Sequence, residues 1–204
     1  MILYDTPLPA PNPRRVRMFA AEKGIDLQLQ PVSLMAREHK SAEHLARNPL
    51  GQTPVLELDD GTTISESVAI CRYLEALNPA VPLFGVSPME IATIEMWIRR
   101  SEFTLGGPVR NYWVNVHPYT AQIVPERFED FGKAAVPQVM AAMAIFDAAL
   151  ADSAFIAGEQ ISMADIVLLS TIDFAAFIGL AMPDTLTNLR RWHKEISARP
   201  NARA

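Results

Sequence analysis

Prolines divide this chain of 204 residues into two parts of different character. Ten of the 16 prolines fall within the first 88 residues, where short apolar stretches alternate with turns. The rest of the chain consists of long segments with helical apolar spacing. Between the two parts, residues 78–88 contain three prolines and a glycine, which oppose helix continuation. We therefore predict a first domain at 1–78, a linker at 79–87 and a second domain at 88–204.

The first part alternates short strands and helices. We predict a strand at 2–4, a helix at 13–23, a half-buried strand at 27–32, a short helix at 41–47, a hairpin of strands 54–58 and 62–64, and a helix capped by Ser65 that ends near Leu77. A strand–helix–strand unit makes a parallel pair, and the hairpin adds an antiparallel edge. The order βαβ followed by ββα predicts an α/β, thioredoxin-like domain.

The second part reads as an all-α helical bundle. Helical spacing predicts helices near 88–115, 123–151, 163–178 and 185–198. Ser162 and Asp165 can cap each other's backbone at the start of the third helix, and Ile161 and Ile166 are spaced for a hydrophobic staple. The apolar run 166–169 predicts that this helix is buried on most faces.

Composition narrows the classes of partner. The formal net charge is −5 and the basic residues are mostly scattered, so we expect no nucleic-acid partner. No apolar run approaches the roughly 20 residues that span a bilayer, so we expect no membrane association. A single cysteine excludes an intrachain disulfide and fits a cytoplasmic setting. The four histidines show no metal-ligand spacing, so we expect no metal.

Two short stretches suit an amino-acid ligand. Pro54 heads a strand although proline cannot donate to a ladder, and a cis Thr53–Pro54 bond would leave the backbone of Thr53 free to pair with a peptide. Glu66 and Ser67 fall in the first turn of the next helix, where N–H groups suit a carboxylate and Glu66 suits an ammonium. The simpler alternative is that Ser65 caps this helix and Glu66 only complements its dipole.

These stretches resemble a known family. Residues 48–56 (Asn-Pro-Leu-Gly-Gln-Thr-Pro-Val-Leu) and 64–74 (Ile-Ser-Glu-Ser-Val-Ala-Ile-Cys-Arg-Tyr-Leu) are similar to the glutathione-site signature of cytosolic glutathione transferases. Residues 161–166 resemble the folding motif of that family's C-terminal domain. The resemblance spans nearly the whole chain, and it implies a homodimer that uses glutathione as co-substrate.

The resemblance also implies which residues bind glutathione. Glu66 and Ser67 would bind the γ-glutamyl group, and the backbone of Thr53, before a cis Pro54, would pair with the cysteinyl unit. Three more residues would approach the glycyl carboxylate: Gln52, His39 and Lys40. A solvated loop remains the alternative for the last two.

The catalytic position departs from the common family pattern. Family members usually place Tyr, Ser or Cys between the first strand and the first helix, whereas residues 6–13 contain none of these. Asn12 is the first candidate, because it resembles the asparagine of some bacterial members and could aim an amide N–H at the sulfur. Thr6 is the second candidate, and Tyr4 lies inside the strand. The alternative for Asn12 is a helix cap before Pro13.

Other residues have several possible roles. Trp97, Arg100 and Trp113 lie where the family builds its hydrophobic substrate pocket, although dimer interface or plain core is an equal alternative for each. Cys71 is interpreted as a small buried apolar residue. Residues 14–17 contain three arginines, which we expect on a solvated face, with an acidic substrate as the minority alternative.

The sequence thus predicts a glutathione transferase that conjugates glutathione thiolate to small hydrophobic electrophiles, a detoxification activity. One alternative is glutathione-dependent reduction of disulfides or peroxides. The other is a non-catalytic protein that binds glutathione or a partner, motivated by the missing hydroxyl or thiol. An isomerase of the maleylacetoacetate type is disfavoured because its Ser-Ser-Cys cluster is absent.

Overall fold

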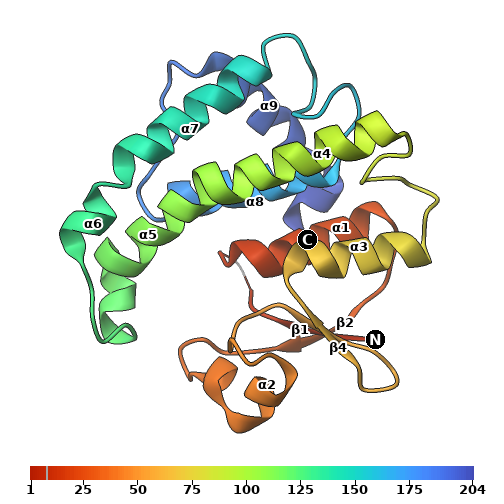
Figure 1. The fold of residues 1–204 in the computed structure, drawn as a ribbon, viewed down its shortest axis with the longest axis vertical. Coiled ribbons are helices and arrows are strands. Elements are labelled where there is room, and N and C mark those ends of the chain that lie inside the picture. Colours follow the sequence, from red (N-terminus) through yellow and green to blue (C-terminus); the bar gives the residue numbers. More distant parts are fainter. Residues whose placement is uncertain (8) are drawn as a thin grey trace. The chain divides into compact units, whose positions relative to one another are not determined.

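A computed structural model describes residues 1–7 and 9–204, and the chain divides into two compact units. The first unit contains residues 1–82 and 200–204, and the second contains 83–199 (Figure 1). The last five residues belong to the first unit, where Arg14 Nη2 donates to the carbonyl of Ala202 at 2.8 Å. The units are an α/β thioredoxin-like domain and an all-helical domain, so the predicted fold class is confirmed.

The first unit is built on a four-stranded mixed sheet of order β2-β1-β3-β4. β1 (Ile2–Asp5) pairs in parallel with β2 (Gln28–Pro31) and antiparallel with β3 (Val55–Glu57). β4 (Thr63–Ser65) extends the sheet as the antiparallel partner of β3. The parallel pair and the hairpin edge are as predicted.

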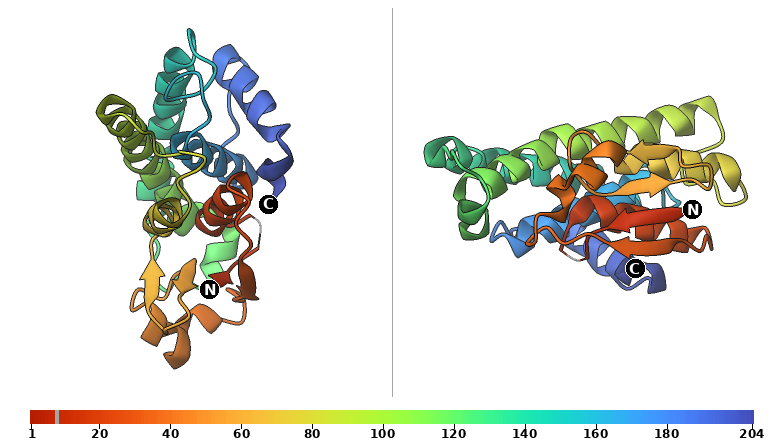
Figure 2. Two further views of the ribbon diagram at one scale, coloured as in Figure 1. Left: turned by 90° about the vertical axis from the view of Figure 1, so that its right-hand side faces the viewer. Right: turned by 90° about the horizontal axis from the view of Figure 1, so that it is seen from below.

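Helices cover both faces of this sheet. α1 (Pro11–Glu22) and α3 (Ser67–Leu77) lie side by side on one face, and α2 (Ala42–Arg47) lies on the other (Figures 1 and 2). Short 3-10 turns precede α2 (η1, Glu38–Lys40) and end the chain (η4, Pro200–Arg203). The core between the sheet and the first pair of helices consists mainly of apolar side chains, with buried Leu3, Val16, Phe19, Leu56, Ile70 and Leu74.

Two local expectations in the first unit are wrong. All four residues of β2 are exposed, and Leu29 is 47 % exposed, because β2 is an edge strand with one neighbour in the sheet. Ser65 does not cap α3. It is the last residue of β4, opposite Val55, and the sheet pairing extends one residue further than the turn spacing indicated.

The regular secondary-structure elements of the second unit are helices. Its elements are α4 (Pro88–Arg100), the π-helical segment η2 (Ser101–Gly106), α5 (Gly107–Val116), the 3-10 turn η3 (Pro118–Gln122), α6 (Glu129–Lys133), α7 (Val136–Ala149), α8 (Met163–Phe177) and α9 (Thr187–Ser197). Every residue of α8 from 163 to 172 is buried. The prediction of a helix buried on most faces is confirmed.

Prolines accompany two of the departures of the second unit's helices from the prediction. The helix expected at 123–151 begins only at Glu129 and is interrupted between Lys133 and Val136. Pro137 has no N–H for the carbonyl four residues earlier, which belongs to Lys133. Pro108 likewise offers none to the carbonyl of Thr104, which lies in the π-helical segment.

The capping pair at the start of α8 is confirmed and has a wider role. The buried carboxylate of Asp165 accepts hydrogen bonds from the backbone N–H of Ser162 at 3.0 Å and from its hydroxyl at 2.9 Å. It also accepts from the backbone N–H of Ile156 at 2.9 Å and from Trp192 Nε1 at 3.0 Å. One carboxylate therefore joins the start of α8, the preceding loop and α9.

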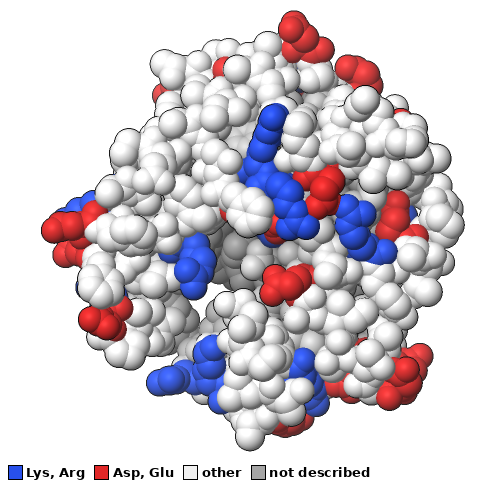
Figure 3. Space-filling view, viewed as in Figure 1, with Lys and Arg blue, Asp and Glu red and all other residues white. Residues whose placement is uncertain are grey.

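The helices and the surface charges bear on which partners the protein can meet. Within the described residues, no helix has both the length and the apolar character needed to cross a bilayer. On the face shown in Figure 3, acidic side chains lie among the basic ones.

Candidate functional site

The loop that precedes β3 contains the Thr53–Pro54 peptide bond, which is cis. The hydroxyl of Thr6, at the end of β1, donates to the carbonyl of Val32 at 3.2 Å and lies 2.8 Å from the hydroxyl of Thr53. Because Thr6 has one hydroxyl proton, the Thr53 hydroxyl is the donor in this second contact. Among the described residues, the backbone hydrogen bonds outside helices and strands use neither the N–H nor the carbonyl of Thr53.

Two buried side chains that the sequence analysis missed hold this loop. His44 Nε2 donates to the carbonyl of Gln52 at 3.0 Å, and Asn48 Nδ2 donates to the same carbonyl at 2.9 Å. Asn48 Oδ1 accepts from the backbone N–H of Leu50 at 3.1 Å. Asn48 stands at the head of the recognised motif, which was a usable signal. The sequence gave no such signal for His44, because a lone histidine in a short helix has many possible roles.

Lys40 supports the same loop from η1. Its ammonium donates to the carbonyls of Leu50 at 3.0 Å and Gly51 at 2.9 Å. Gly51 has a φ of +57°, and a Cβ there would lie 2.7 Å from the carbonyl oxygen of His39 and 2.8 Å from Lys40 Nζ. Glycine is therefore required by both the backbone angle and the close approach of Lys40.

His39 lies beside Lys40 and is partly buried. Burial lowers the pKa of the imidazole, and the neighbouring positive charge of Lys40 lowers it further. Its Nδ1 is buried and has no hydrogen-bond partner among the described residues. His39 is therefore neutral at pH 7, with one ring nitrogen unpaired among the described residues.

Glu66 joins β4 to α3 in an unusual conformation. It is exposed and has φ 70° and ψ 115°, which lies in a region that side-chain-bearing residues seldom occupy. It precedes α3 as its N-cap residue, but its side chain makes no capping bond to a described residue. The exposed Glu66 side chain therefore lies at the start of α3 without capping the backbone of the helix.

Ser67 is the first residue of α3, and it is buried. Arg15 Nη1 donates to its hydroxyl at 3.4 Å. Arg15 itself is buried, so the expectation that it lies on a solvated face is wrong. The helical phase was a usable signal, because Arg15 lies one turn before the core residue Phe19.

The N-terminus of α1 carries the first candidate catalytic residue. The helix begins at Pro11 with Ala10 as its N-cap residue, so Asn12 lies inside the first turn and is exposed. The interpretation of Asn12 as a cap is therefore wrong. Pro11 and Pro13 have no N–H, so Asn12 contributes one of the few backbone N–H groups at this end of α1.

The other two candidates near the first strand, Thr6 and Tyr4, already interact with neighbouring residues. The hydroxyl of Thr6 is buried and bonded to Val32 and Thr53. Tyr4 lies in β1 with the guanidinium of Arg47 4.2 Å from its ring centroid. Burial raises the pKa of Tyr4, as does its hydrogen bond with Glu57. Tyr4 therefore keeps its proton at neutral pH.

The three residues expected in a substrate pocket fall into two groups in the second unit. The guanidinium of Arg100 lies 4.6 Å from the ring centroid of Trp97, and that ring is 5.8 Å from Phe146. Trp113 belongs to a different aromatic cluster, with ring centroids at 4.6 Å from His117, 5.5 Å from Tyr119 and 5.2 Å from Phe174.

Neither a metal cluster nor a reactive thiol is found in the part of the chain that the structure describes. No group of three or more His, Cys, Asp or Glu side chains there could hold a metal ion. Cys71 is fully buried in α3, and burial raises the pKa of its thiol far above the usual range. Cys71 therefore behaves as a small apolar core residue.

Comparison with known proteins places this architecture in one family. The glutathione S-transferase N-terminal domain matches residues 10–77, and the glutathione S-transferase C-terminal domain matches residues 113–200. Glutathione S-transferase 2 of Saccharomyces cerevisiae is 38 % identical over 209 residues, covering 100 % of this chain and 88 % of that protein. The chain belongs to the glutathione S-transferase family and is a transferase.

Solved structures agree with this assignment. Gtt2 from Saccharomyces cerevisiae has a TM-score of 0.94 at 37 % identity, covering 99 % of this chain and 98 % of that one. A glutathione S-transferase domain-containing protein from Marinobacter aquaeolei has a TM-score of 0.94 at 35 % identity, with coverage of 99 % and 100 %. The chain is therefore similar to Gtt2 over its full length.

Proposed function

We propose that this glutathione transferase joins the glutathione thiolate to small hydrophobic electrophiles. The sulfur attacks an electrophilic carbon, a C–S bond forms, the leaving group departs with its electron pair, and the thiol proton passes to solvent. The observation that carries the proposal is the start of α3, where an exposed Glu66 precedes a buried Ser67 backed by Arg15. This arrangement offers opposite charges to the two ends of an amino-acid head group.

In this proposal the γ-glutamyl group binds at the start of α3. Its ammonium pairs with Glu66, and its carboxylate accepts from Ser67 and the first backbone N–H groups of the helix. The strained backbone of Glu66 supports this role, because such conformations concentrate at ligand sites. The backbone of Thr53, next to Pro54, pairs with the cysteinyl unit.

The glycyl carboxylate is proposed to meet Gln52 and His39, with Lys40 acting on the loop. Both donor bonds found for Lys40 go to carbonyls of residues 50 and 51, which supports a role in holding the loop as well as in adding positive charge. His39 has a ring nitrogen with no partner among the described residues, which supports a role as a donor to this carboxylate.

For the sulfur, we propose Asn12 as the donor that favours thiolate over thiol. Its exposure at the first turn of α1 supports this choice. Thr6 is the second candidate, but its bonds to Val32 and Thr53 support a positioning role instead. The apolar part of the electrophile is assigned to Trp97 and Trp113, with Arg100 beside Trp97.

We also propose that the protein is a cytoplasmic homodimer that acts in detoxification. Family membership supports the dimer and the substrate class. Gel filtration with light scattering at micromolar concentration should give twice the chain mass, and a monomer would contradict this part of the proposal.

A second candidate reaction is the reduction of small disulfides. Residues 6–13 contain no Tyr, Ser or Cys, which leaves the usual hydroxyl or thiol of conjugating enzymes without a counterpart. Glutathione thiolate would attack one sulfur of the disulfide and release the other as a thiolate. A second glutathione would then yield oxidised glutathione and the second thiol. Faster turnover with a small disulfide than with an aryl halide would favour this reaction.

The decisive experiment is a pH titration of the thiolate absorbance of bound glutathione. The parent protein should lower the pKa of the bound thiol below that of free glutathione, and Asn12→Ala should raise it again. Thr6→Ala is the matched control, because it should weaken glutathione binding without changing the thiol pKa. Binding without any lowering of the thiol pKa in the parent would reject the conjugation proposal.

A further inference from the structure

A π-helical turn, η2 (Ser101–Gly106), separates α4 from α5 in the second unit. The local sequence favours it, because Gly106 and Gly107 impose few limits on the backbone. Pro108 also has no N–H to donate to the carbonyl of Thr104, so a regular α-helix would lose a hydrogen bond here. Turns of this kind are rare inside helices and occur frequently at functional sites.

The π-turn changes the direction of every side chain in α5. An α-helix turns by about 100° per residue, so in a regular helix continued from the buried Ser101, Tyr112 would point about 20° from the direction of Ser101. Trp113 would point about 120° away. A π-turn contains about one residue more than the matching α-helical segment, which sets α5 back by about 100°. Trp113, and not Tyr112, then lies within about 20° of the direction of Ser101.

The contacts of α5 agree with this rotated setting. The ring centroid of Trp113 lies 5.2 Å from that of Phe174 on α8. Asn115 packs against α6, where a Cβ on Gly132 would lie 2.8 Å from Asn115 Cβ. Trp113 and Asn115 are about 160° apart around a helix, so these two contacts lie on opposite sides of α5. The helix therefore turns Trp113 toward α8 and Asn115 toward α6.

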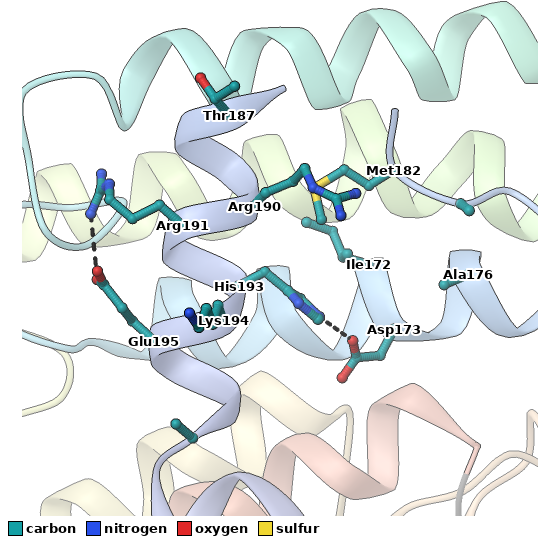
Figure 4. Close-up of a pocket in the computed structure, with 12 residues that line it drawn as sticks. Ile172, Asp173, Ala176, Met182, Thr187, Arg190, Arg191, His193, Lys194 and Glu195 are labelled. Carbon is teal, nitrogen blue, oxygen red and sulfur yellow. Dashed lines mark hydrogen bonds and ion pairs between the residues drawn. The ribbon is translucent and has the colours of Figure 1, made fainter. Parts of the chain in front are cut away.

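α8 is held in place independently of α5. Asp173 of α8 and His193 of α9 point toward each other, and Asp173 Oδ1 lies 2.6 Å from His193 Nε2 (Figure 4). The buried Asp165 of α8 also accepts a hydrogen bond from Trp192 Nε1 of α9 at 3.0 Å. Both bonds oppose a rotation of α8 that would follow a change in α5. The direction of Phe174 is therefore fixed, and the π-turn decides which residue of α5 meets it.

We propose that the π-turn selects Trp113, rather than Tyr112, as the ring beside Phe174, and that this choice gives the protein a preference for flat aromatic electrophiles. Phe177 continues the cluster, with its ring centroid 6.2 Å from that of Phe174, and is 55 % exposed. A flat aromatic molecule can stack on such rings, whereas an alkyl chain cannot. The preference rests on the proposed conjugation reaction, but the role of the π-turn does not.

The first test removes the π-turn without removing a side chain. Deletion of Gly106 allows a regular α-helical turn to form while α4 and α5 keep their directions. We expect this variant to stay folded, with a Tm within about 5 °C of the parent. Deletion of the exposed Ala144 in the regular helix α7 is the matched control. It should lower the Tm by more than about 10 °C, because α7 has no additional residue to lose.

Double-mutant cycles then show which ring meets Phe174. Urea denaturation of Trp113→Leu, Phe174→Leu and the double variant gives the coupling between the two rings. We expect the same coupling when the cycle is repeated in the Gly106 deletion. A cycle that uses Tyr112→Leu in place of Trp113→Leu should show no coupling. These measurements need no catalytic activity.

Kinetics test the substrate preference. The quantity measured is the ratio of kcat/KM for 1-chloro-2,4-dinitrobenzene to kcat/KM for 1-iodobutane. We expect this ratio to fall about tenfold in Trp113→Leu, because the flat face for stacking is lost. It should stay within about twofold of the parent in Tyr112→Leu and in the Gly106 deletion. The KM for glutathione should not change in any of the three.

Two results would overturn the proposal. One is coupling of Phe174 to Tyr112 instead of Trp113, and the other is an equal loss of aromatic preference in Tyr112→Leu and Trp113→Leu. If the Gly106 deletion does not fold, the cycles in the full-length chain still decide which ring meets Phe174. If neither electrophile is conjugated, the proposed function fails, whereas the cycles still test the π-turn.

Discussion

The residues proposed to bind glutathione in the first unit and the aromatic residues of the second unit are organised in opposite ways. In the first unit, a continuous loop is fixed through its carbonyl groups by His44, Asn48 and Lys40. In the second unit, Trp97 and Trp113 belong to separate aromatic clusters on a long helical segment. Hydrogen bonds to the backbone hold one geometry, whereas ring packing tolerates exchange of similar side chains.

This contrast has a functional consequence. A site that binds one constant molecule benefits from a loop held in place by several directional bonds. A surface that receives varied apolar molecules benefits from non-directional contacts. We therefore expect changes in the loop to affect glutathione binding. Changes among the aromatic residues should affect the choice of electrophile.

The largest expected effect tests whether the second unit is needed for the geometry of the first. Asp165→Ala removes the acceptor of four hydrogen bonds in the core of the second unit. Because the four donor groups of Ser162, Ile156 and Trp192 are left buried, we expect a loss of about 3–5 kcal/mol in the free energy of unfolding. Urea denaturation measures this loss.

Asp184→Ala is the control for that measurement. Its side chain is 94 % exposed, so its change should stay within about 0.5 kcal/mol. Below its unfolding midpoint, the Asp165→Ala protein should still bind glutathione with the affinity of the parent. Loss of that affinity in the folded protein would show that the two sites are not organised independently.

The next effect tests the hydrogen-bonded loop. Asn48→Ala leaves the N–H of Leu50 without its acceptor and removes one donor to the carbonyl of Gln52. We expect a loss of about 1–3 kcal/mol in stability and a rise of roughly tenfold in the KM for glutathione. Asn78→Ala is the matched control in the same unit, because its side chain donates to the carbonyl of Lys23 outside this loop. An unchanged KM for glutathione in Asn48→Ala would contradict this role.

A smaller effect separates stability from binding at one residue. Glycine accepts the φ of 70° found at Glu66 without the steric cost of a Cβ. We expect Glu66→Gly to be more stable than Glu66→Ala by about 1 kcal/mol, measured by thermal unfolding. Both variants should bind glutathione equally weakly in calorimetry, because both lack the carboxylate. Parent-like affinity in either variant would remove Glu66 from the site.

The smallest effect concerns the second unit. Arg100→Gln removes an exposed cation from the face of Trp97, which should cost about 0.5–1 kcal/mol of stability or less. Steady-state kinetics should show an altered KM for the electrophile and an unchanged KM for glutathione. Arg99→Gln is the control, because Arg99 pairs with Glu95 and Glu102 instead. A change confined to the KM for glutathione would contradict the assignment of Arg100 to the electrophile pocket.

Sequence patterns were informative where an element is determined locally. The Ser162–Asp165 pair identified the start of α8, and the Asp60-Gly61 turn identified the hairpin of β3 and β4. Patterns were misleading where two local signals competed. Ser65 has the residue type of a helix cap, but strand pairing with Val55 includes it in β4. Helical spacing continued through residues 134 and 135, although the helix is interrupted there and begins again at Val136, next to Pro137.

By itself, the sequence determined the family, the order of the elements, the split into an α/β and a helical part, and the motif around Pro54. These depend on residue type at short spacing, which acts through local backbone preferences. Only the tertiary structure showed that His44 and Asn48 hold the carbonyl of Gln52, that Arg15 lies behind Ser67, and that Thr6 contacts Thr53. The last two contacts join residues 52 and 47 positions apart, and such distant pairs are formed by the packing of helices on the sheet and of neighbouring loops.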